Sequence, residues 1–124
     1  MKNCNEKFKD WDIKARAYKY ALAVIRLIDG LPREATSQIV GKQLLRSATS
    51  VGANIAEAQA ASSRREFTNF MSHALKSANE SRFWIGLLRD SGRVRYDDIV
   101  EIYHETRELS NILAASLLKL RGKR

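Results

Sequence analysis

Few residues in this 124-residue chain have the types and spacing that catalysis or metal binding requires. Glu101 and His104 stand at the Glu-x-x-His spacing of di-iron helical bundles, in which facing helices supply carboxylates and imidazoles to the metals. Such a site needs a second pair of this kind and two further carboxylates. Phe70 stands three residues before the other histidine, His73, so the second pair is missing. We therefore predict no metal site and no cofactor.

Nucleophilic and phosphate-transfer chemistry have no better support. The only cysteine, Cys4, lacks the neighbouring sequence of a catalytic thiol, and no glycine-rich phosphate loop occurs. A single cysteine excludes an intrachain disulfide and favours a reducing compartment. The first residues have no apolar core typical of a signal peptide, and no apolar run is long enough to cross a bilayer. The sequence thus predicts a cytoplasmic protein that is not an enzyme.

Positive charge is the property that most suggests a ligand. The chain has 22 Lys and Arg against 14 Asp and Glu, a net charge of +8. An excess of this size favours polyanions such as RNA or DNA, although many small proteins are basic without binding either. The candidates for phosphate contacts lie in the first and third expected helices and near the C-terminus: Arg82, Arg89, Arg93, Arg16, Lys19, Arg26, Lys119, Arg121, Lys123 and Arg124.

The elements that must position these residues are predicted to be helices. Apolar residues recur at three- and four-residue steps over about 11–29, 35–61, 63–90 and 97–120. Ser63 and Glu66 fit a capping box at the start of the third helix. Short loops between long helices make neighbours antiparallel, so we expect one all-α domain over 1–124, an up-down-up-down four-helix bundle. In the first helix, Trp11, Ala15, Tyr18, Leu22 and Ile25 recur at these steps, with Ala17, Ala21, Val24 and Ile28 beside them.

The second expected helix is unusual because Glu57 is its only charged residue between Arg46 and Arg64. One of its faces is small and nearly neutral, with Lys42 as the only charge; it contains Leu45, Thr49, Gly52, Ala53, Ala56 and Ala60. An ordinary surface helix turns a charged face to water. We therefore predict that this face, with Ala53 and Ala56, packs against another subunit. An exposed alanine-rich helix, stable by its propensity, is the alternative.

A polar stripe runs beside the core face of the same helix, and the third helix carries a matching one. Because a buried carboxylate is costly unless paired, we expect a closed hydrogen-bond network rather than isolated groups. A network of this kind fixes helix register more often than it performs catalysis. The expected members are Arg46, Ser50, Asn54, Glu57, Ser77 and Glu80.

The fourth expected helix places acidic residues on one face: Asp98, Glu101, Glu105 and Glu108. Two arrangements compete. In the first, the acidic face pairs with a basic face of the next protomer and fixes the register of a ring. Alternatively, the cations gather on one rim of an oligomer and bind phosphates.

Several motifs resemble one family of bacterial four-helix-bundle proteins, typified by the 23S rRNA intervening-sequence proteins. The resemblance rests on "QLLRSATSVGANIAEAQ", on "SRREFTNFMSHALKSANE" and on "RFWIGLLRDSG". Its most specific part is "SVGANIAE", and Ser77 and Glu80 match the family's serine and glutamate in the third helix. Ala58 and Lys76 stand where the family often has glycine, which a helix tolerates.

The resemblance implies a homopentamer of four-helix protomers. It points more weakly to a related branch, the accessory variability determinant proteins of diversity-generating retroelements, which bind a reverse transcriptase and its RNA. The resemblance and the positive charge together lead us to expect a non-enzymatic oligomeric adaptor that binds RNA or DNA. A more specific expectation is that this adaptor acts beside a reverse transcriptase. The alternative is a structural or protein-interaction ring without affinity for nucleic acid.

Overall fold

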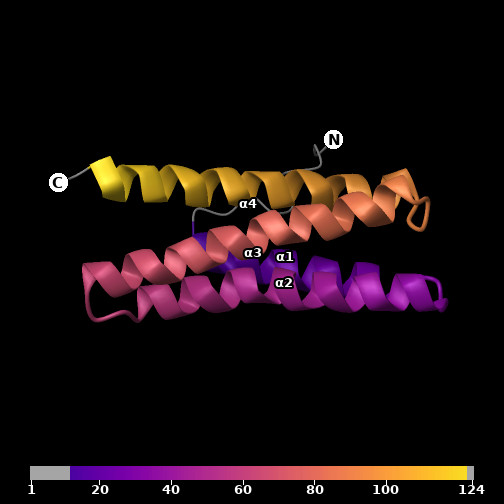
Figure 1. Ribbon diagram of the computed structural model, residues 1–124, viewed down its shortest axis with the longest axis horizontal. Coiled ribbons are helices and arrows are strands. Elements are labelled where there is room, and N and C mark those ends of the chain that lie inside the picture. The colour runs from indigo at the N-terminus through magenta and orange to yellow at the C-terminus, as the bar shows by residue number, and fades with distance from the viewer. Residues whose placement is uncertain (1–11, 123–124) are drawn as a thin grey trace.

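The computed structural model describes residues 12–122 and contains four α-helices: α1 (Ile13–Asp29), α2 (Ala35–Gln59), α3 (Arg64–Asp90) and α4 (Tyr96–Gly122). No strand occurs within this range. The turns alternate between the two ends of the molecule, so each helix is antiparallel to the next (Figure 1). The predicted all-α, four-helix class is confirmed. The positions of Cys4, Trp11, Lys123 and Arg124 lie outside the described residues.

Local capping explains where two of the helices begin. The helix α1 starts two residues later than expected because Asp12, at its N-cap, accepts a hydrogen bond from the backbone amide of Lys14. Ser63 caps α3 by accepting from the amide of Glu66, as the capping box predicts. The Glu66 carboxylate accepts in return from the amide of Ser62, one residue before the position that the motif specifies. The entry of α3 is therefore held by two side chains.

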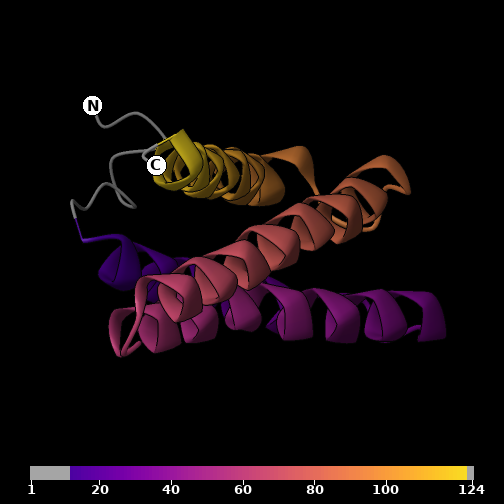
Figure 2. The ribbon, with the colours of Figure 1, turned by 60° about the vertical axis from the view of Figure 1, so that its left-hand side comes forward.

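The helices pack in the order α1–α2–α3–α4, with α1 and α4 closing the bundle. Among neighbouring helices, the contact between α2 and α3 is the most extensive and that between α1 and α4 the least. Figure 2 shows α3 inclined between α2 and α4. Since α3 packs mainly on α2 and α4, it lies diagonally across the bundle from α1.

Two apolar clusters of buried residues meet at a polar layer to which every helix contributes. The Tyr20 hydroxyl lies 2.7 Å from Thr106 Oγ1, and Ser47 Oγ lies 2.8 Å from Ser81 Oγ. All four side chains are buried. Their hydrogen bonds satisfy polar groups that would otherwise be costly in the core. The layer therefore fixes how the four helices align along their axes.

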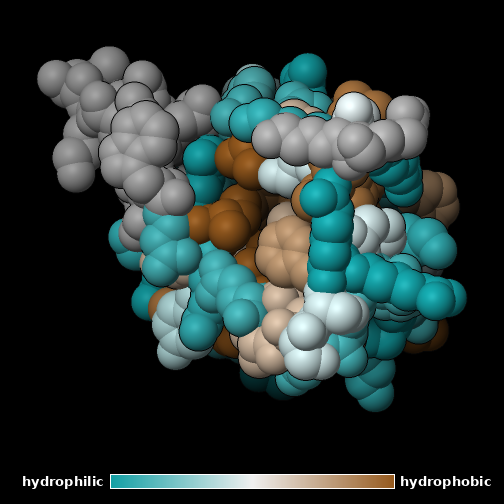
Figure 3. Space-filling model, turned by 90° about the vertical axis from the view of Figure 1, so that its left-hand side faces the viewer, coloured by the Kyte–Doolittle hydropathy of each residue, from teal (hydrophilic) through white to brown (hydrophobic). Residues whose placement is uncertain are grey.

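The second apolar cluster, near the α2–α3 turn, is open at its end. Ile13, Phe67 and Leu120 pack against it but remain partly exposed. Figure 3 views this end of the bundle and shows apolar surface between hydrophilic side chains. The Arg64 guanidinium donates to the backbone carbonyl of Leu120 at 2.6 Å and ties the start of α3 to the end of α4.

Of the two apolar sets in α1, the core takes members of the flanking one, Ala17 and Val24, together with Tyr20. The structure buries Ala17, Tyr20 and Val24, whereas Tyr18 is 67% exposed and Ile25 lies at the surface. Apolar residues occur on both sides of α1, so periodicity alone does not select the buried face. On the buried face, the Tyr20 hydroxyl finds a hydrogen-bond partner in Thr106.

Candidate nucleic-acid interface

Two of the predicted phosphate-binding residues, Arg82 and Arg89, converge on Tyr103 of α4. They share one face of α3 because seven residues make about two helical turns. Gly86 lies between them, and a Cβ built there would stand 3.9 Å from Arg89 Nη2. The Arg89 guanidinium carbon lies 4.6 Å from the centroid of the Tyr103 ring, a cation–π contact. Both Arg89 and Arg82 act electrostatically on the Tyr103 hydroxyl.

The two guanidinium groups change the acidity of the tyrosine. Arg89 above all, with a smaller effect from Arg82, lowers the pKa of the Tyr103 hydroxyl below its usual value of 10.0, because nearby positive charge favours the phenolate; burial opposes this shift. This point of the surface thus stabilises negative charge on an oxygen atom. A phosphate site requires the same property.

The titration of Tyr103 tests this geometry directly. We expect its pKa, followed by the ultraviolet absorbance of tyrosinate, to lie below the ordinary tyrosine value. Replacing Arg89 with Gln should raise that pKa, because the main stabilising charge is removed. Arg121→Gln, at the far end of α4, is the matched control. A Tyr103 pKa that is equal in the wild type and in Arg89→Gln would show that the contact does not form in solution.

Arg107 extends this surface along α4. It lies one helical turn beyond Tyr103, is exposed, and has no ion pair among residues 12–122. Arg89 shares its charge with Asp90, whose Oδ1 lies 2.8 Å from Arg89 Nε. We call the set Arg82, Arg89, Tyr103 and Arg107 the arginine patch. Sequence reasoning missed Tyr103 and Arg107, although their four-residue spacing places them on one face.

The structure gives Arg16 a different role from the predicted one. Its guanidinium donates two hydrogen bonds to Glu105, at 2.6 and 2.9 Å, and only 11% of its side chain is exposed. Glu105 is fully buried rather than part of an exposed acidic face. Burial raises the pKa of Glu105, and the charge of Arg16 opposes that rise. Arg16 therefore links α1 to α4. Because its guanidinium is occupied by Glu105, we no longer count it among the candidates for phosphate contacts.

The other predicted cations fall into separate groups. Lys19, Arg26 and Arg93 lie around a groove between α1 and α4, far along the bundle from Lys119 and Arg121 in the last turns of α4. Arg93 pairs with Glu34 at 3.0 Å and, with the hydrogen bond from Ser37, lowers the pKa of Glu34 to about 2. Glu34 also caps α2, so this pair ties the α1–α2 turn to the turn before α4.

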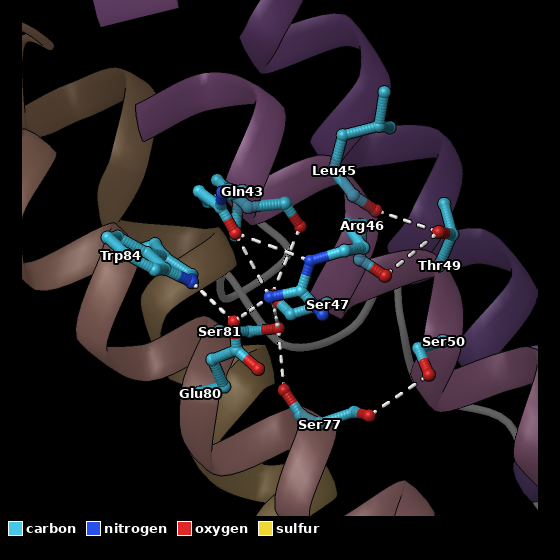
Figure 4. Close-up of polar contacts among 11 residues, drawn as sticks. Gln43, Leu45, Arg46, Ser47, Thr49, Ser50, Ser77, Glu80, Ser81 and Trp84 are labelled. Carbon is cyan, nitrogen blue, oxygen red and sulfur yellow. Dashed lines mark hydrogen bonds and ion pairs between the residues drawn. The ribbon is translucent and has the colours of Figure 1, made fainter. Parts of the chain in front are cut away.

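Part of the predicted polar network forms on the seam between α2 and α3 (Figure 4). Arg46 pairs with Glu80, whose carboxylate also accepts from Trp84 Nε1 at 2.9 Å. Ser77 donates to Ser50 across the seam at 3.1 Å. More than half of the Arg46 side chain is exposed, so this pair lies at the surface and not in the core.

Two other expected members of the network lie outside it. Glu57 is exposed, and its side chain has no hydrogen bond or ion pair with any residue that the structure describes. Asn54 donates to the carbonyl and the hydroxyl of Ser50 in its own helix, at 2.9 and 3.0 Å. The Glu57 side chain therefore takes no part in the network on the α2–α3 seam of the protomer.

The small neutral face of α2 is shared between α1 and the surface. A Cβ built at Gly52 would lie 3.6 Å from the Cβ of Ala17, so the glycine permits a close approach of α1. Ala56 is half-buried and Ala53 is exposed. Contact with α1 thus explains why part of this face carries no charged residues. The prediction that another subunit buries the exposed part of the face stays a prediction.

The described residues contain no cluster of three or more His, Cys, Asp or Glu side chains that could hold a metal ion. Glu101 lines the groove between α1 and α4, whereas the His104 ring packs edge-on against Tyr103 with centroids 6.4 Å apart. In the range 12–122, none of the helices has the length and apolar character needed to cross a membrane.

Comparison with known proteins adds a family and a solved structure to this geometry. The family model for the 23S rRNA-intervening sequence protein matches residues 9–115. A crystal structure of a protein of unknown function from the S23 ribosomal protein family of Bacteroides thetaiotaomicron is also similar. The two chains share 33% identity with a TM-score of 0.79, over 85% of this chain and 97% of the other. A search of curated proteins gave no match.

Proposed function

The chain belongs to the 23S rRNA-intervening sequence protein family, and from this premise we propose that it is a non-enzymatic, oligomeric adaptor that binds RNA or DNA. The observation that carries the proposal is the convergence of Arg82 and Arg89 on Tyr103, with Arg107 one turn away. The net charge of +8 supports it, because a positive protein attracts the phosphate backbone.

The arginine patch has the chemistry of a backbone contact. A guanidinium group presents several N–H donors in a plane, which suits the oxygens of a phosphate. Arg82 and Arg107 have no carboxylate partner among the described residues, so their charge is available to a ligand. A tyrosine ring beside arginines also resembles the platforms on which unpaired bases stack. Little base preference is expected, because no motif that reads base edges is present.

Binding should depend steeply on salt. We expect a labelled mixed-sequence RNA and a duplex DNA to bind at low salt and to dissociate as salt rises. Each phosphate contact contributes about 0.9 to the slope of log affinity against log salt for duplex DNA and about 0.7 for single strands. The double variant Arg82→Glu with Arg107→Glu should weaken binding at least tenfold. It should also reduce the slope by the contribution of two phosphate contacts. Titration by fluorescence anisotropy at low and moderate salt measures both.

Lys42→Glu with Arg65→Glu is the matched control for these reversals. It makes the same change in net charge at exposed positions on α2 and α3 outside the arginine patch. If the control weakens binding as much as the patch variant, the interaction is diffuse and the patch is not the site. Absence of binding at low salt by the folded wild type would exclude the nucleic-acid function.

A protein-interaction ring without nucleic-acid affinity is the competing function. Its support is the exposure of large apolar side chains on three helices, namely Tyr18, Ile39 and Phe83. The same titration separates the two functions. The most specific form of our proposal, an accessory role beside a reverse transcriptase, requires that the two proteins copurify when they are expressed together.

A further inference from the structure

A groove of about 640 Å³ lies between α1 and the start of α4. These two helices make the least extensive contact between neighbouring helices, which leaves them apart at this end of the bundle. The volume is in the range of pockets that bind small molecules. Aliphatic side chains form an apolar floor: Leu22, Ala23, Leu27, Leu31, Val94 and Ile102. No residue of the arginine patch lines this groove, so its chemistry is separate from the site described above.

Positive charge is concentrated at the end of the groove where α1 ends and α4 begins. Arg26 stands in the last turn of α1, and Arg93 and Arg95 belong to the turn that precedes α4. Arg93 pairs with Glu34 at 3.0 Å, whereas Arg26 and Arg95 are exposed and form no ion pair within residues 12–122. Two guanidinium groups without a carboxylate partner present several N–H donors to one phosphate group. This end of the groove therefore favours a phosphate.

The α4 side of the groove carries carboxylates. Asp98 and Glu101 line it about one helical turn apart. The Asp98 side chain is exposed and makes no hydrogen bond or ion pair with any residue in the described range, although Arg26 and Arg95 line the same groove. An ionised carboxylate only accepts hydrogen bonds. A ligand that lies against this wall must therefore supply donors.

The three parts of the lining restrict the class of ligand. A fatty acid matches the apolar floor and the arginines, but its alkyl chain has no donor for Asp98. A sugar phosphate matches the arginines and Asp98, because its hydroxyl groups donate, but it leaves the apolar floor in water. A nucleoside monophosphate has all three groups in one molecule: a phosphate, ribose hydroxyls and a flat base with an apolar face.

We propose that the groove between α1 and α4 binds a nucleoside 5′-monophosphate. Arg26 and Arg95 donate to the phosphate, the ribose donates a hydroxyl hydrogen bond to Asp98, and the base covers the apolar floor. A free nucleotide and the 5′-phosphorylated end of an RNA chain present the same groups. The inference goes beyond the proposed function, because it concerns other residues on another side of α4 and does not require the arginine patch to bind a nucleic-acid backbone.

Isothermal titration calorimetry with AMP tests the site, because a purine covers more of the apolar floor than a pyrimidine. The wild type should bind AMP more tightly than ribose 5-phosphate, which lacks the base, and more tightly than adenosine, which lacks the phosphate. Arg26→Gln with Arg95→Gln should weaken AMP binding by about tenfold, because the phosphate loses both guanidinium groups. Lys42→Gln with Arg65→Gln is the matched control: it makes the same change in net charge at exposed positions outside the groove and should leave the affinity for AMP unchanged.

Asp98→Ala separates a hydrogen bond to the ribose from simple attraction between charges. If charge alone acts, removal of a carboxylate beside the phosphate should strengthen the binding of any nucleotide. The proposal expects the opposite for AMP, a loss of affinity, because its ribose hydroxyls lose their acceptor. 2′,3′-Dideoxyadenosine monophosphate has no such hydroxyl. It should bind the wild type more weakly than AMP does, and Asp98→Ala should not weaken it further.

Competition with short RNA distinguishes the two sources of the nucleotide. Displacement of AMP by a 5′-phosphorylated oligoribonucleotide, but not by its 5′-hydroxyl counterpart, would show that the groove takes the end of an RNA chain. If neither displaces AMP, the ligand is the free nucleotide. The inference is overturned if AMP does not bind at millimolar concentration, if Arg26→Gln with Arg95→Gln binds it as the wild type does, or if Asp98→Ala binds it more tightly. Each of these results leaves the arginine patch untouched, and the salt-dependent titration described above assesses that site separately.

Discussion

Replacing Arg16 with methionine is expected to lower the free energy of unfolding by about 3–5 kcal/mol. The guanidinium donates two hydrogen bonds to Glu105, whose side chain is fully buried between α1 and α4. Methionine leaves that carboxylate without a cationic partner in a poorly solvated site. The carboxylate must then remain charged and unpaired or take up a proton, and both outcomes disfavour the folded state at neutral pH.

Arg46→Met is the matched control, because Arg46 pairs with Glu80 at the surface, where an ion pair contributes about 0–1 kcal/mol. Combining Arg16→Met with Glu105→Leu should recover most of the lost stability, since no buried charge is then left alone. Urea denaturation followed by circular dichroism measures all four proteins. If Arg16→Met costs no more than Arg46→Met, Glu105 is not buried in solution as the structure has it.

The pair also matters for the groove. Arg16 lies one turn before Lys19, the first residue of α1 that lines it, and Glu105 lies one turn after Glu101 on its α4 side. Because α1 and α4 make the least extensive contact between neighbouring helices, this ion pair and the Tyr20–Thr106 contact are the main polar links across the seam that the structure describes. Its loss should therefore disturb the shape of the groove as well as the stability.

Properties that depend on neighbouring residues were predictable from the sequence. The four helices follow from apolar periodicity, and the entry of α3 follows from the capping box at Ser63. The shared face of Arg82 and Arg89 follows from their seven-residue spacing alone. Each of these statements concerns a single helix, whose geometry is nearly the same in every protein.

Properties that depend on how two helices align were not predictable. Glu105 falls on an acidic face of α4 in the sequence, and only the alignment with α1 shows that Arg16 covers it. Tyr103 lies between Arg82 and Arg89 only because of the alignment between α3 and α4. The groove likewise depends on the space between α1 and α4. No periodic pattern within one helix contains this information.

Removing the residue that sets the alignment of α1 should destabilise the whole bundle. Tyr20 is fully buried, and its hydroxyl lies 2.7 Å from Thr106 Oγ1 in the polar layer that all four helices share. Tyr20→Ala should lower the free energy of unfolding by about 3–5 kcal/mol, the usual cost of removing a buried aromatic ring. Denaturant unfolding at neutral pH measures this loss, and Tyr18→Ala is the control because Tyr18 is exposed.

Tyr20→Phe separates the hydroxyl from the ring and completes the test. It should cost about 1–3 kcal/mol, because Thr106 Oγ1 loses a buried partner and retains only its bond to the Ile102 carbonyl at 2.6 Å. Thr106→Val removes the other half of the contact, and the double variant should be less destabilised than the sum of the two single variants. Additive effects would mean that the two hydroxyls do not interact. The packing of the aromatic ring alone would then have to orient α1, and the polar layer would not set the helix alignment.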